Sequence, residues 1–292
     1  MYYIVYSFLW LISLLPFRVL HFFSDGIYLL MYYVIKYRKD IVMNNLQIAF
    51  PEKTEQERIK IAKQFYHNFL DTFLETIKFI TLTPKQIQQR STGEFDLING
   101  LAAKGLNVYV MAGHQFNWEF ANIIYGMNVK IPFVAVYMPI NNKILNKIFL
   151  KFRAKGGTVL ISAHNFKNQM HNIFTRQYSL ALAADQNPGN PSQAYWMNFF
   201  SKPVPFITGP AKGAIRSKAA VVLIGFKKVK RGYYSFSTTL LAENASLYTR
   251  QQLTALYKNE LERIIRNDPA NYLWSHRRWK YDWKPEYGEV YK

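Results

Sequence analysis

The sequence contains no cysteine among its 292 residues. A chain without cysteine can form no disulfide, hold no metal through thiolates and use no cysteine nucleophile, and it fits a reducing compartment. The length allows one large α/β domain with a substantial core, or two small domains. We favour one domain preceded by an N-terminal appendage.

Acidic residues are scarce. Asp and Glu total 18 against 37 Lys and Arg, which gives a formal net charge of +19. Between Phe120 and Ala242 the only acidic residue is Asp185. Such a field attracts nucleic acid, acidic lipid headgroups or an acidic protein. Aromatic residues make up 17% of the chain. Tyr and Trp suit membrane interfaces, so the composition favours a membrane surface, although base stacking would use the same side chains.

Charge is also absent from the first 17 residues. The run from Met1 to Leu15 is apolar, Pro16 and Arg18 interrupt it, and a second apolar run follows over 19–37. Each run is near the lower limit of roughly 17 residues for crossing a bilayer. No basic residue precedes the first run and no small-residue cleavage site follows it, which argues against a secretory signal.

A basic cluster ends this region: Lys36, Arg38 and Lys39 mark the cytoplasmic side by the positive-inside bias. We therefore predict that residues 1–37 form a hydrophobic membrane anchor, as one short span or an interfacial helical hairpin, ahead of the main domain at 38–292. The alternative is an amphipathic helix packed on the core of that domain.

Apolar periodicity predicts alternating strands and helices after Gly93. Before it, Pro51 separates two helices, at 38–50 and 54–80, and Thr54 with Glu57 forms a capping box for the second. The alternation indicates an α/β fold with a sheet flanked by helices, in which active residues gather at the carboxyl ends of strands. Strands are predicted at 107–112, 132–137, 158–161, 179–184, 219–226 and 233–241. Helices are predicted from Pro84 and at 116–125, 143–153, 166–175, 209–218 and 249–267.

The segment GHQFNWE, residues 113–119, follows the first of these strands directly. A turn of this length can fold the carboxylate of Glu119 back against the imidazole of His114. The carboxylate would then fix the ring tautomer and leave the other nitrogen to take a proton from a hydroxyl. The alternatives are a His at a strand end beside a Glu near a helix N-terminus, or metal binding, for which no third ligand is near in sequence.

Three further groups of residues suggest chemistry. Asp185 and Gln186 follow a strand end, and we expect Asp185 to form an ion pair with a nearby Arg or Lys, as support for the site first and as a substrate contact second. Thr208 is placed to cap the helix that Pro210 begins. The free N–H groups there, beside Gly209, suit a phosphate or an oxyanion, or belong to an ordinary capped helix. Arg277 and Arg278 lie among aromatic residues, and their guanidinium groups suit lipid phosphates.

The stretch AGHQFNWE resembles the His-x4-Asp/Glu motif of the lysophospholipid acyltransferase superfamily, and within it the chain is similar to the bacterial lipid A late acyltransferases. The similarity covers nearly the whole chain, and several blocks in a shared order carry it. These are YRKDIVMNNLQIAFPE at 37–52, KGGTVLI at 155–161, AADQNPG at 183–189, PFITGPAKGAIRSKAAVV at 205–222 and WSHRRWK at 274–280.

The resemblance implies a glycerol-3-phosphate acyltransferase-like fold with a mostly parallel sheet, and an enzyme on the cytoplasmic face of the inner membrane. Such an enzyme takes an acyl chain from acyl carrier protein or a coenzyme A thioester and esterifies a lipid hydroxyl. His114 is then the general base and Glu119 its partner. No cofactor, metal or nucleic acid is expected. Substrate contacts are expected from Asn117, Asp185, Gln186, Thr208, Gly209, Arg277 and Arg278.

Two positions depart from the family pattern. Many members have Arg after the second strand, in a Tyr-Arg-Pro sequence, where this chain has Met138, so that contact is missing or comes from Lys143 or Lys147. Gln115 stands where Phe or Tyr is expected. The departures leave open a related enzyme acting on a lysophospholipid or an amino-acid lipid. A non-enzymatic basic protein that binds nucleic acid at the membrane is the other alternative.

Overall fold

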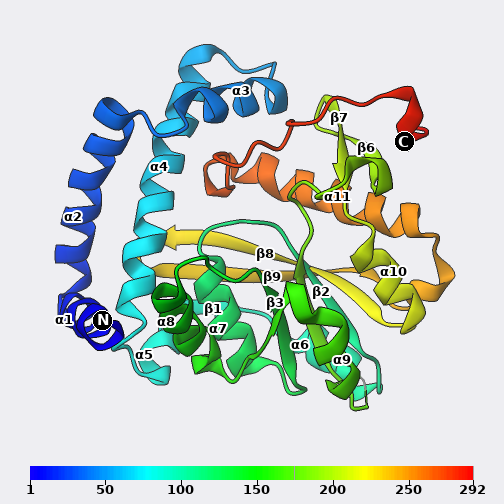
Figure 1. The fold of residues 1–292 in the computed structure, drawn as a ribbon, viewed down its shortest axis with the longest axis horizontal. Coiled ribbons are helices and arrows are strands. Elements are labelled where there is room, and N and C mark those ends of the chain that lie inside the picture. The colour runs from blue at the N-terminus through cyan, green and yellow to red at the C-terminus, as the bar shows by residue number, and fades with distance from the viewer. Residues whose placement is uncertain (174, 292) are drawn as a thin grey trace.

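The computed structural model describes residues 1–173 and 175–291. Its centre is a seven-stranded sheet in the order β1-β9-β8-β2-β5-β3-β4 (Figure 1). The strands from β8 to β4 are parallel, and β9 is antiparallel to β8, so the predicted α/β fold with a mostly parallel sheet is confirmed. The bounds are β1 Ser91–Gly93, β2 Val108–Ala112, β3 Phe133–Tyr137, β4 Val159–Ser162, β5 Ser179–Ala183, β8 Ala220–Lys230 and β9 Tyr233–Ala242.

Helices connect most of the strands. The predicted helix at 166–175 is observed as α9, and residue 174 lies outside the described residues. The short strand β1, the helix α6 and the hairpin of β6 (Tyr195–Phe199) and β7 (Lys202–Phe206) were not predicted. The main helices are α3 Lys39–Ala49, α4 Glu55–Lys78, α5 Pro84–Gln88, α6 Asp96–Ala103, α7 Trp118–Asn128, α8 Lys143–Arg153, α9 Phe166–Ile173, α10 Gly209–Arg216 and α11 Arg250–Asn267.

The sheet separates two hydrophobic cores. Along β2, Tyr109 and Met111 pack into one core, whereas Val108 and Val110 pack into the other. This alternation is what a buried strand imposes, because successive side chains point to opposite faces. Helices α3, α4, α10 and α11 contribute to the first core, and α6 and α7 to the second. The first core therefore backs the carboxyl end of β2, where His114 follows.

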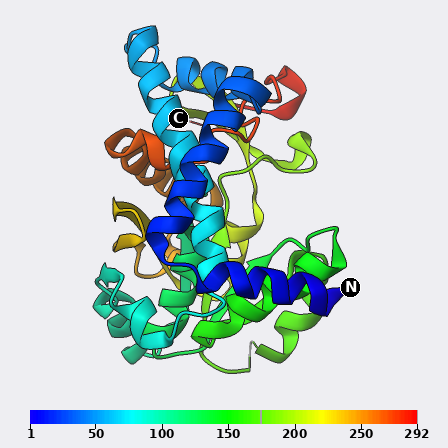
Figure 2. The ribbon, with the colours of Figure 1, turned by 90° about the vertical axis from the view of Figure 1, so that its left-hand side faces the viewer.

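The N-terminal segment forms an L. Helix α2 (Phe17–Leu29) continues as a π-helical stretch, η1 (Leu30–Ile35). Helix α1 (Tyr2–Leu14) meets this continuous segment at an angle of 110°. Helix α2 runs alongside α4, and α1 crosses below it (Figure 2). Within the described residues, no single helix is both long and apolar enough to cross a bilayer, although this bent pair meets the criteria of length and composition together.

The inner face of the L is packed on the domain. Leu20, Tyr28 and Tyr32 are buried.

The capping box predicted for α4 is confirmed, since Thr54 and Glu57 exchange both hydrogen bonds. The long helix that receives α2 therefore begins at the residue that the sequence indicates.

Candidate active site

The imidazole of His114 pairs with Asp185. Strands β2 and β5 are parallel neighbours with Ala112 opposite Ala183, so the residues that follow them meet at one edge of the sheet. His114 Nδ1 lies 2.7 Å from Asp185 Oδ1, and the backbone N–H of His114 donates to Asp185 Oδ2 over 2.9 Å. A carboxylate only accepts, so Nδ1 carries the proton and Nε2 is left as an acceptor. Asp185 is 1% exposed and the His114 side chain 24% exposed.

The pair holds complementary charges. Burial alone would raise the pKa of Asp185, but the charge of His114 and hydrogen bonds from its ring and backbone lower that pKa to about 2. Burial alone would lower the pKa of His114, but the Asp185 carboxylate outweighs it and raises that pKa above its ordinary value, with a smaller contribution from the charge of Glu119. This arrangement stabilises the imidazolium that forms when Nε2 accepts a proton.

Glu119 bonds to a different residue from the one expected. Arg153 at the end of α8 donates from Nε to Glu119 Oε2 over 2.7 Å and from Nη2 to Oε1, and Trp118 Nε1 donates to Oε1 over 3.2 Å. The prediction that Glu119 hydrogen-bonds to His114 is therefore wrong, because the guanidinium of Arg153 donates to both carboxylate oxygens. The predicted ion pair of Asp185 with an Arg or Lys is also wrong, since the imidazole of His114 is the partner of that carboxylate.

A close crossing of backbones brings Arg153 to Glu119. The turn after α8 passes against α7, where a Cβ at Gly156 would collide with the carbonyl oxygen of Ile123. At the start of α7, Asn117 is fully buried and its Oδ1 accepts from the N–H of Phe120, as an N-cap. The structure thus places Asn117 as support for the loop that carries His114. Arg153 was missed because it lies 34 residues from its partner in sequence.

The segment 271–279, here called the C-terminal strap, lies against the loop that carries His114. The N–H of Leu273 donates to the carbonyl of His114 over 3.0 Å, and the N–H of Phe116 donates to the carbonyl of Asn271 over 3.1 Å. Gln115 forms an isolated β-bridge with Tyr272 and is 1% exposed. The residue where the family pattern has an aromatic ring is therefore part of a backbone contact that fixes His114.

The other side of the strap holds the loop that carries Asp185. Arg278 Nη1 donates to Asn187 Oδ1 over 2.9 Å and to the Pro205 carbonyl over 3.0 Å. The N–H of Asn187 donates to His276 Nε2 over 3.2 Å. Burial lowers the pKa of His276 to about 4, so its ring is neutral and able to accept. Gln186, between Asp185 and Asn187, is half-buried.

The two adjacent arginines of the strap differ in environment. Arg278 is 1% exposed, and its guanidinium lies 4.5 Å from the ring centre of Phe206. Arg277 is exposed. The structure therefore leaves Arg277 accessible to a ligand at the surface and uses Arg278 to hold the strap to the Asp185 loop.

Asn45 in α3 fastens the strap from outside. Its Nδ2 donates to the carbonyls of Trp274 and His276, over 2.7 Å in each case, and the side chain is 2% exposed. Arg38 Nη1 donates to the carbonyl of Ser275 over 3.0 Å. Two of the sequence blocks quoted above thus meet in space. Asn45 was not singled out from the sequence, although it lies in the first of them.

The start of α10 differs from the prediction. Thr208 is the N-cap residue, but its φ of −89° and ψ of −18° are helical, and its side chain accepts no hydrogen bond at the cap. The predicted capping by Thr208 is therefore wrong, since an N-cap side chain reaches back to the helix only from an extended backbone. A Cβ at Gly209 would meet no atom within 4 Å, so this end of the helix borders open space.

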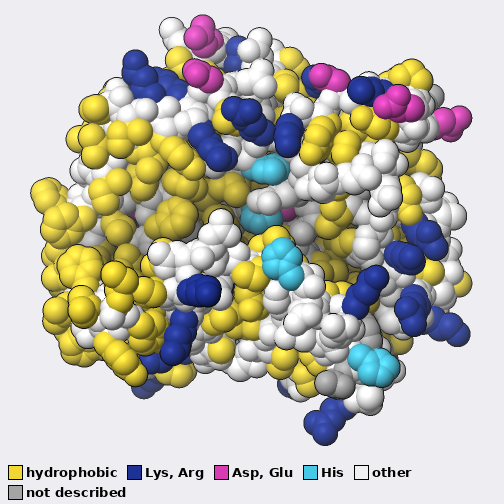
Figure 3. All heavy atoms as spheres, viewed as in Figure 1, with side chains coloured by type: hydrophobic (Ala, Val, Ile, Leu, Met, Phe, Trp, Pro, Cys, Tyr) yellow, Lys and Arg dark blue, Asp and Glu magenta, His cyan; other side chains and the backbone are white. Residues whose placement is uncertain are grey.

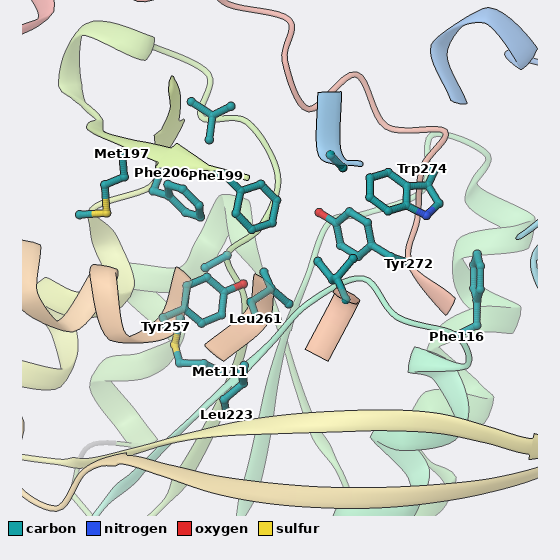
Figure 4. Close-up of a cluster of buried hydrophobic side chains, with 14 of the residues drawn as sticks. Met111, Phe116, Met197, Phe199, Phe206, Leu223, Tyr257, Leu261, Tyr272 and Trp274 are labelled. Atoms are coloured by element: carbon teal, nitrogen blue, oxygen red, sulfur yellow. The ribbon is translucent and has the colours of Figure 1, made fainter. Parts of the chain in front are cut away.

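A narrow apolar pocket adjoins this helix start and the Asp185 loop. Its volume is about 20 Å³, so a hydrocarbon chain would enter it only if the side chains around it moved. Figure 4 shows the ring of Tyr257 between Met111 and Phe206 in this region. Tyr257 also donates to the carbonyl of Ala112 over 2.9 Å, which ties the pocket to the end of β2. The lining residues are Met111, Ala184, Phe206, Ile207, Pro210, Ala211, Ala214, Val221, Leu253, Thr254 and Tyr257.

One face of the molecule is hollowed near its centre. Figure 3 shows two His side chains in a central hollow, Lys and Arg side chains above it, and a continuous apolar surface extending from it toward the N-terminal helices. Met138, where the family pattern has Arg, is 63% exposed. Lys147, one suggested substitute, lies instead with its Nζ 4.6 Å from the ring centre of Tyr2. In the described part of the chain, no group of three or more His, Asp or Glu side chains is placed to hold a metal.

Comparisons with known proteins identify the family of the chain. The family described as "Bacterial lipid A biosynthesis acyltransferase" matches residues 1–281. A lipid A biosynthesis palmitoleoyltransferase of Escherichia coli (strain K12) is 23% identical over 93% of this chain and 88% of its own length. A lipid A biosynthesis lauroyltransferase of the same strain is 24% identical over 93% and 89%. The chain belongs to the bacterial lipid A biosynthesis acyltransferase family.

Proposed function

We propose that the protein transfers a fatty acyl chain from a thioester to a hydroxyl of a lipid A precursor. The observation that carries the proposal is the His114–Asp185 pair, which leaves Nε2 of the imidazole as the acceptor on a side chain that is 24% exposed. Family membership supports acyl transfer, and two relatives are named as a palmitoleoyltransferase and a lauroyltransferase of lipid A biosynthesis. We further propose that the sheet and its helices share the arrangement of glycerol-3-phosphate acyltransferases.

The proposed reaction needs no enzyme nucleophile. His114 Nε2 takes the proton of the acceptor hydroxyl as the oxygen attacks the thioester carbonyl carbon. The tetrahedral intermediate collapses, the carbon–sulfur bond breaks, and the thiolate leaves with the proton that His114 returns. Asp185 keeps Nδ1 protonated throughout and stabilises the imidazolium. Glu119 acts with Arg153 to hold α7 and to add negative charge near the ring.

The start of α10 is the proposed oxyanion site. Its first N–H groups donate no bond to the side chain of Thr208, and Gly209 allows close approach of a substrate. Free N–H groups at a helix start favour developing negative charge. The acyl chain enters the pocket lined by Met111, Phe206 and Tyr257 as those side chains move apart.

The donor and the location are part of the proposal. An excess of 19 positive charges suits acyl carrier protein, which is acidic, and also a phosphorylated lipid. Coenzyme A thioesters carry phosphates and suit the same surface. We place the protein at the cytoplasmic face of the inner membrane, where the exposed apolar residues of α1 and α2 meet lipid. Gln186 and Arg277 are the proposed contacts to the acceptor.

Purified protein in lipid or detergent would test the function directly. A labelled acyl-carrier thioester and a coenzyme A thioester are each offered with a lipid A precursor, a lysophospholipid and an amino-acid lipid. Transfer to the lipid A precursor is expected, and His114→Gln should lower it by about 10²–10⁴-fold, the usual share of a general base. Transfer only to another acceptor would overturn the proposed substrate. Unchanged transfer by His114→Gln would overturn the proposed base.

A further inference from the structure

The N-terminal helices expose one long apolar face, here called the N-terminal apolar face. Ile4 is 75% exposed, Phe22 is 74% exposed and Val34 is 71% exposed, so the face extends from the start of α1 to the end of η1. Phe8, Leu11 and Ile27 lie between them and are exposed as well. Large side chains exposed side by side along two helices mark a contact with an apolar partner.

The bend in this segment is fastened by hydrogen bonds. Lys78 Nζ donates to the carbonyls of Ser13 over 2.7 Å and Leu15 over 2.8 Å, and Thr81 Oγ1 donates to Ser13 over 2.8 Å. These are carbonyls at the end of α1, which lack partners inside the helix. If α1 continued straight into α2, Lys78 and Thr81 would lose these hydrogen bonds. The 110° angle is therefore held by α4.

The inner face of α2 is committed to polar contacts with the domain. Ser24 donates to Asp71 over 2.7 Å, His21 Nε2 lies 3.1 Å from Glu75, and Arg231 donates to Asp25 over 2.9 Å. A spanning arrangement would separate α2 from these partners and leave the three polar side chains in hydrocarbon, where unpaired polar groups are costly. The contacts therefore favour a helix that stays on the domain and offers only its outer face to lipid.

Cations stand at both ends of the L. Beside α1, Lys151 donates to the hydroxyl of Tyr6 over 3.1 Å, and Lys147 lies against the ring of Tyr2. Beyond η1, Lys36 and Arg38 are exposed. Amphipathic helices that lie in a bilayer surface carry basic residues beside the apolar face, and these attract anionic headgroups. Basic clusters at both ends also favour one and the same side of the membrane for both ends.

We propose that α1 and α2 lie flat in one leaflet of a bilayer that contains anionic lipid, as a rigid L-shaped interfacial anchor. Both ends of the L face the same side of the membrane. Helix α1 supports this reading by length, since 13 residues rise only about 20 Å against a hydrocarbon core of about 30 Å. The proposal rests on the membrane location proposed above, and it holds for any lipid acceptor.

The lack of native cysteine makes a depth measurement direct. Single substitutions Ile4→Cys, Phe8→Cys, Phe22→Cys and Val34→Cys in the full chain would each carry a fluorescent thiol label. The control is Leu247→Cys, which is 79% exposed and lies outside the N-terminal helices. Vesicles contain phosphatidylglycerol and lipid brominated either near the headgroup or near the chain end. We expect stronger quenching by the headgroup bromine at all four positions and none at the control.

A spanning segment gives a different profile. Phe8→Cys and Phe22→Cys would then be quenched most by bromine near the chain end, and Lys36→Cys would react with an impermeant maleimide from the side opposite to Tyr3→Cys. Either result would overturn the flat L, as would the absence of quenching at every position. Acyl transfer is measured on the same vesicles. Active protein with a spanning profile contradicts the anchor alone, and flat but inactive protein contradicts the reaction alone.

The headgroup contact has its own variant pair. Lys147→Gln with Lys151→Gln should weaken binding to phosphatidylglycerol vesicles by about fivefold for each lysine removed. The matched control removes two exposed lysines elsewhere, Lys104→Gln with Lys167→Gln, and should leave binding within about twofold, because charge beyond a Debye length is screened. Equal losses in the two double variants would contradict a headgroup site beside α1.

Discussion

His114 Nδ1 lies 2.7 Å from Asp185 Oδ1, although 71 residues separate the two in sequence. The carboxylate accepts from the ring and from the backbone N–H of the same histidine, so ring position and loop position are fixed together. Nε2 can therefore accept a proton without a change in the position of the ring. The pair thus supplies the tautomer and the stabilised cation that a general base requires.

Replacing Asp185 by Asn should reduce turnover. We expect Asp185→Asn to lower kcat by about 10²–10⁴-fold, because an amide no longer selects the tautomer with a free Nε2. Since the carboxylate raises the pKa of His114, its loss should also move the acid limb of the kcat/KM profile to lower pH. Initial rates across pH would show both effects. An acid limb that stays in place would argue against the pairing.

Asp185 also links stability to pH. Its pKa of about 2 is below the ordinary 3.8, so the ionised form favours the folded state. That contribution is complete above about pH 4 and is lost as pH falls toward about 2. The free energy of unfolding should therefore differ between wild-type protein and Asp185→Asn above this interval, and the difference should narrow through it. Denaturant unfolding at several pH values measures this, and a constant difference would contradict the depressed pKa.

The position of His114 at a strand end could be predicted from sequence, but its hydrogen-bond partner could not. His114 directly follows an apolar run that predicts a strand, and strand ends carry the chemistry in parallel sheets. Its pairing with Asp185 depends on β5 being the neighbour of β2, which no local pattern encodes. Glu119 is nearer in sequence, but Arg153 takes its oxygens. The ion pair of Glu119 with a guanidinium from a separate helix forms in place of the contact with His114 that the local turn suggests.

Elsewhere too, features that depend on local sequence were predictable and features that depend on distant residues were not. The helix and strand bounds from β2 to β5 follow local periodicity, and the structure agrees with them to within a few residues. The capping of α4 by Thr54 was predictable because both partners lie within one turn. The failure of Thr208 to cap α10 depends on a backbone angle that tertiary packing sets. Contacts of Asn45 with Trp274 join residues 229 positions apart.

A double-mutant cycle should separate the structural from the catalytic role of Glu119. Glu119→Gln alone leaves Arg153 without its carboxylate, and we expect a loss of about 3 kcal/mol in unfolding free energy, as for other broken buried pairs. Adding Arg153→Gln should restore part of that stability. Thermal unfolding and kcat are measured on all three variants. If activity recovers with stability, Glu119 serves the fold, and if it stays low, the carboxylate itself is needed for catalysis.

Asn45 should affect catalysis from a distance. Asn45→Ala leaves two carbonyls of the strap without this donor, which costs about 2 kcal/mol of stability. We expect kcat to fall because the strap bonds directly to the His114 loop. The matched control is Asn142→Ala, which removes the N-cap of α8 and costs about 1 kcal/mol without touching the strap. Rates are compared well below both melting temperatures. An equal effect of the two variants on kcat would contradict positioning by the strap.

The two neighbouring arginines of the strap should respond differently. Arg277 is exposed, so Arg277→Ala should fold normally and raise the KM for the lipid acceptor by about tenfold, the usual effect of losing one charge-assisted hydrogen bond, while the KM for the donor changes less. Arg278 is buried and donates to Asn187 and Pro205, so Arg278→Ala should lower the melting temperature and kcat together. Lys280→Ala, another exposed cation beside the strap, is the control for loss of charge alone. If it raises the acceptor KM as much as Arg277→Ala does, the effect comes from the general field and not from a specific contact of Arg277.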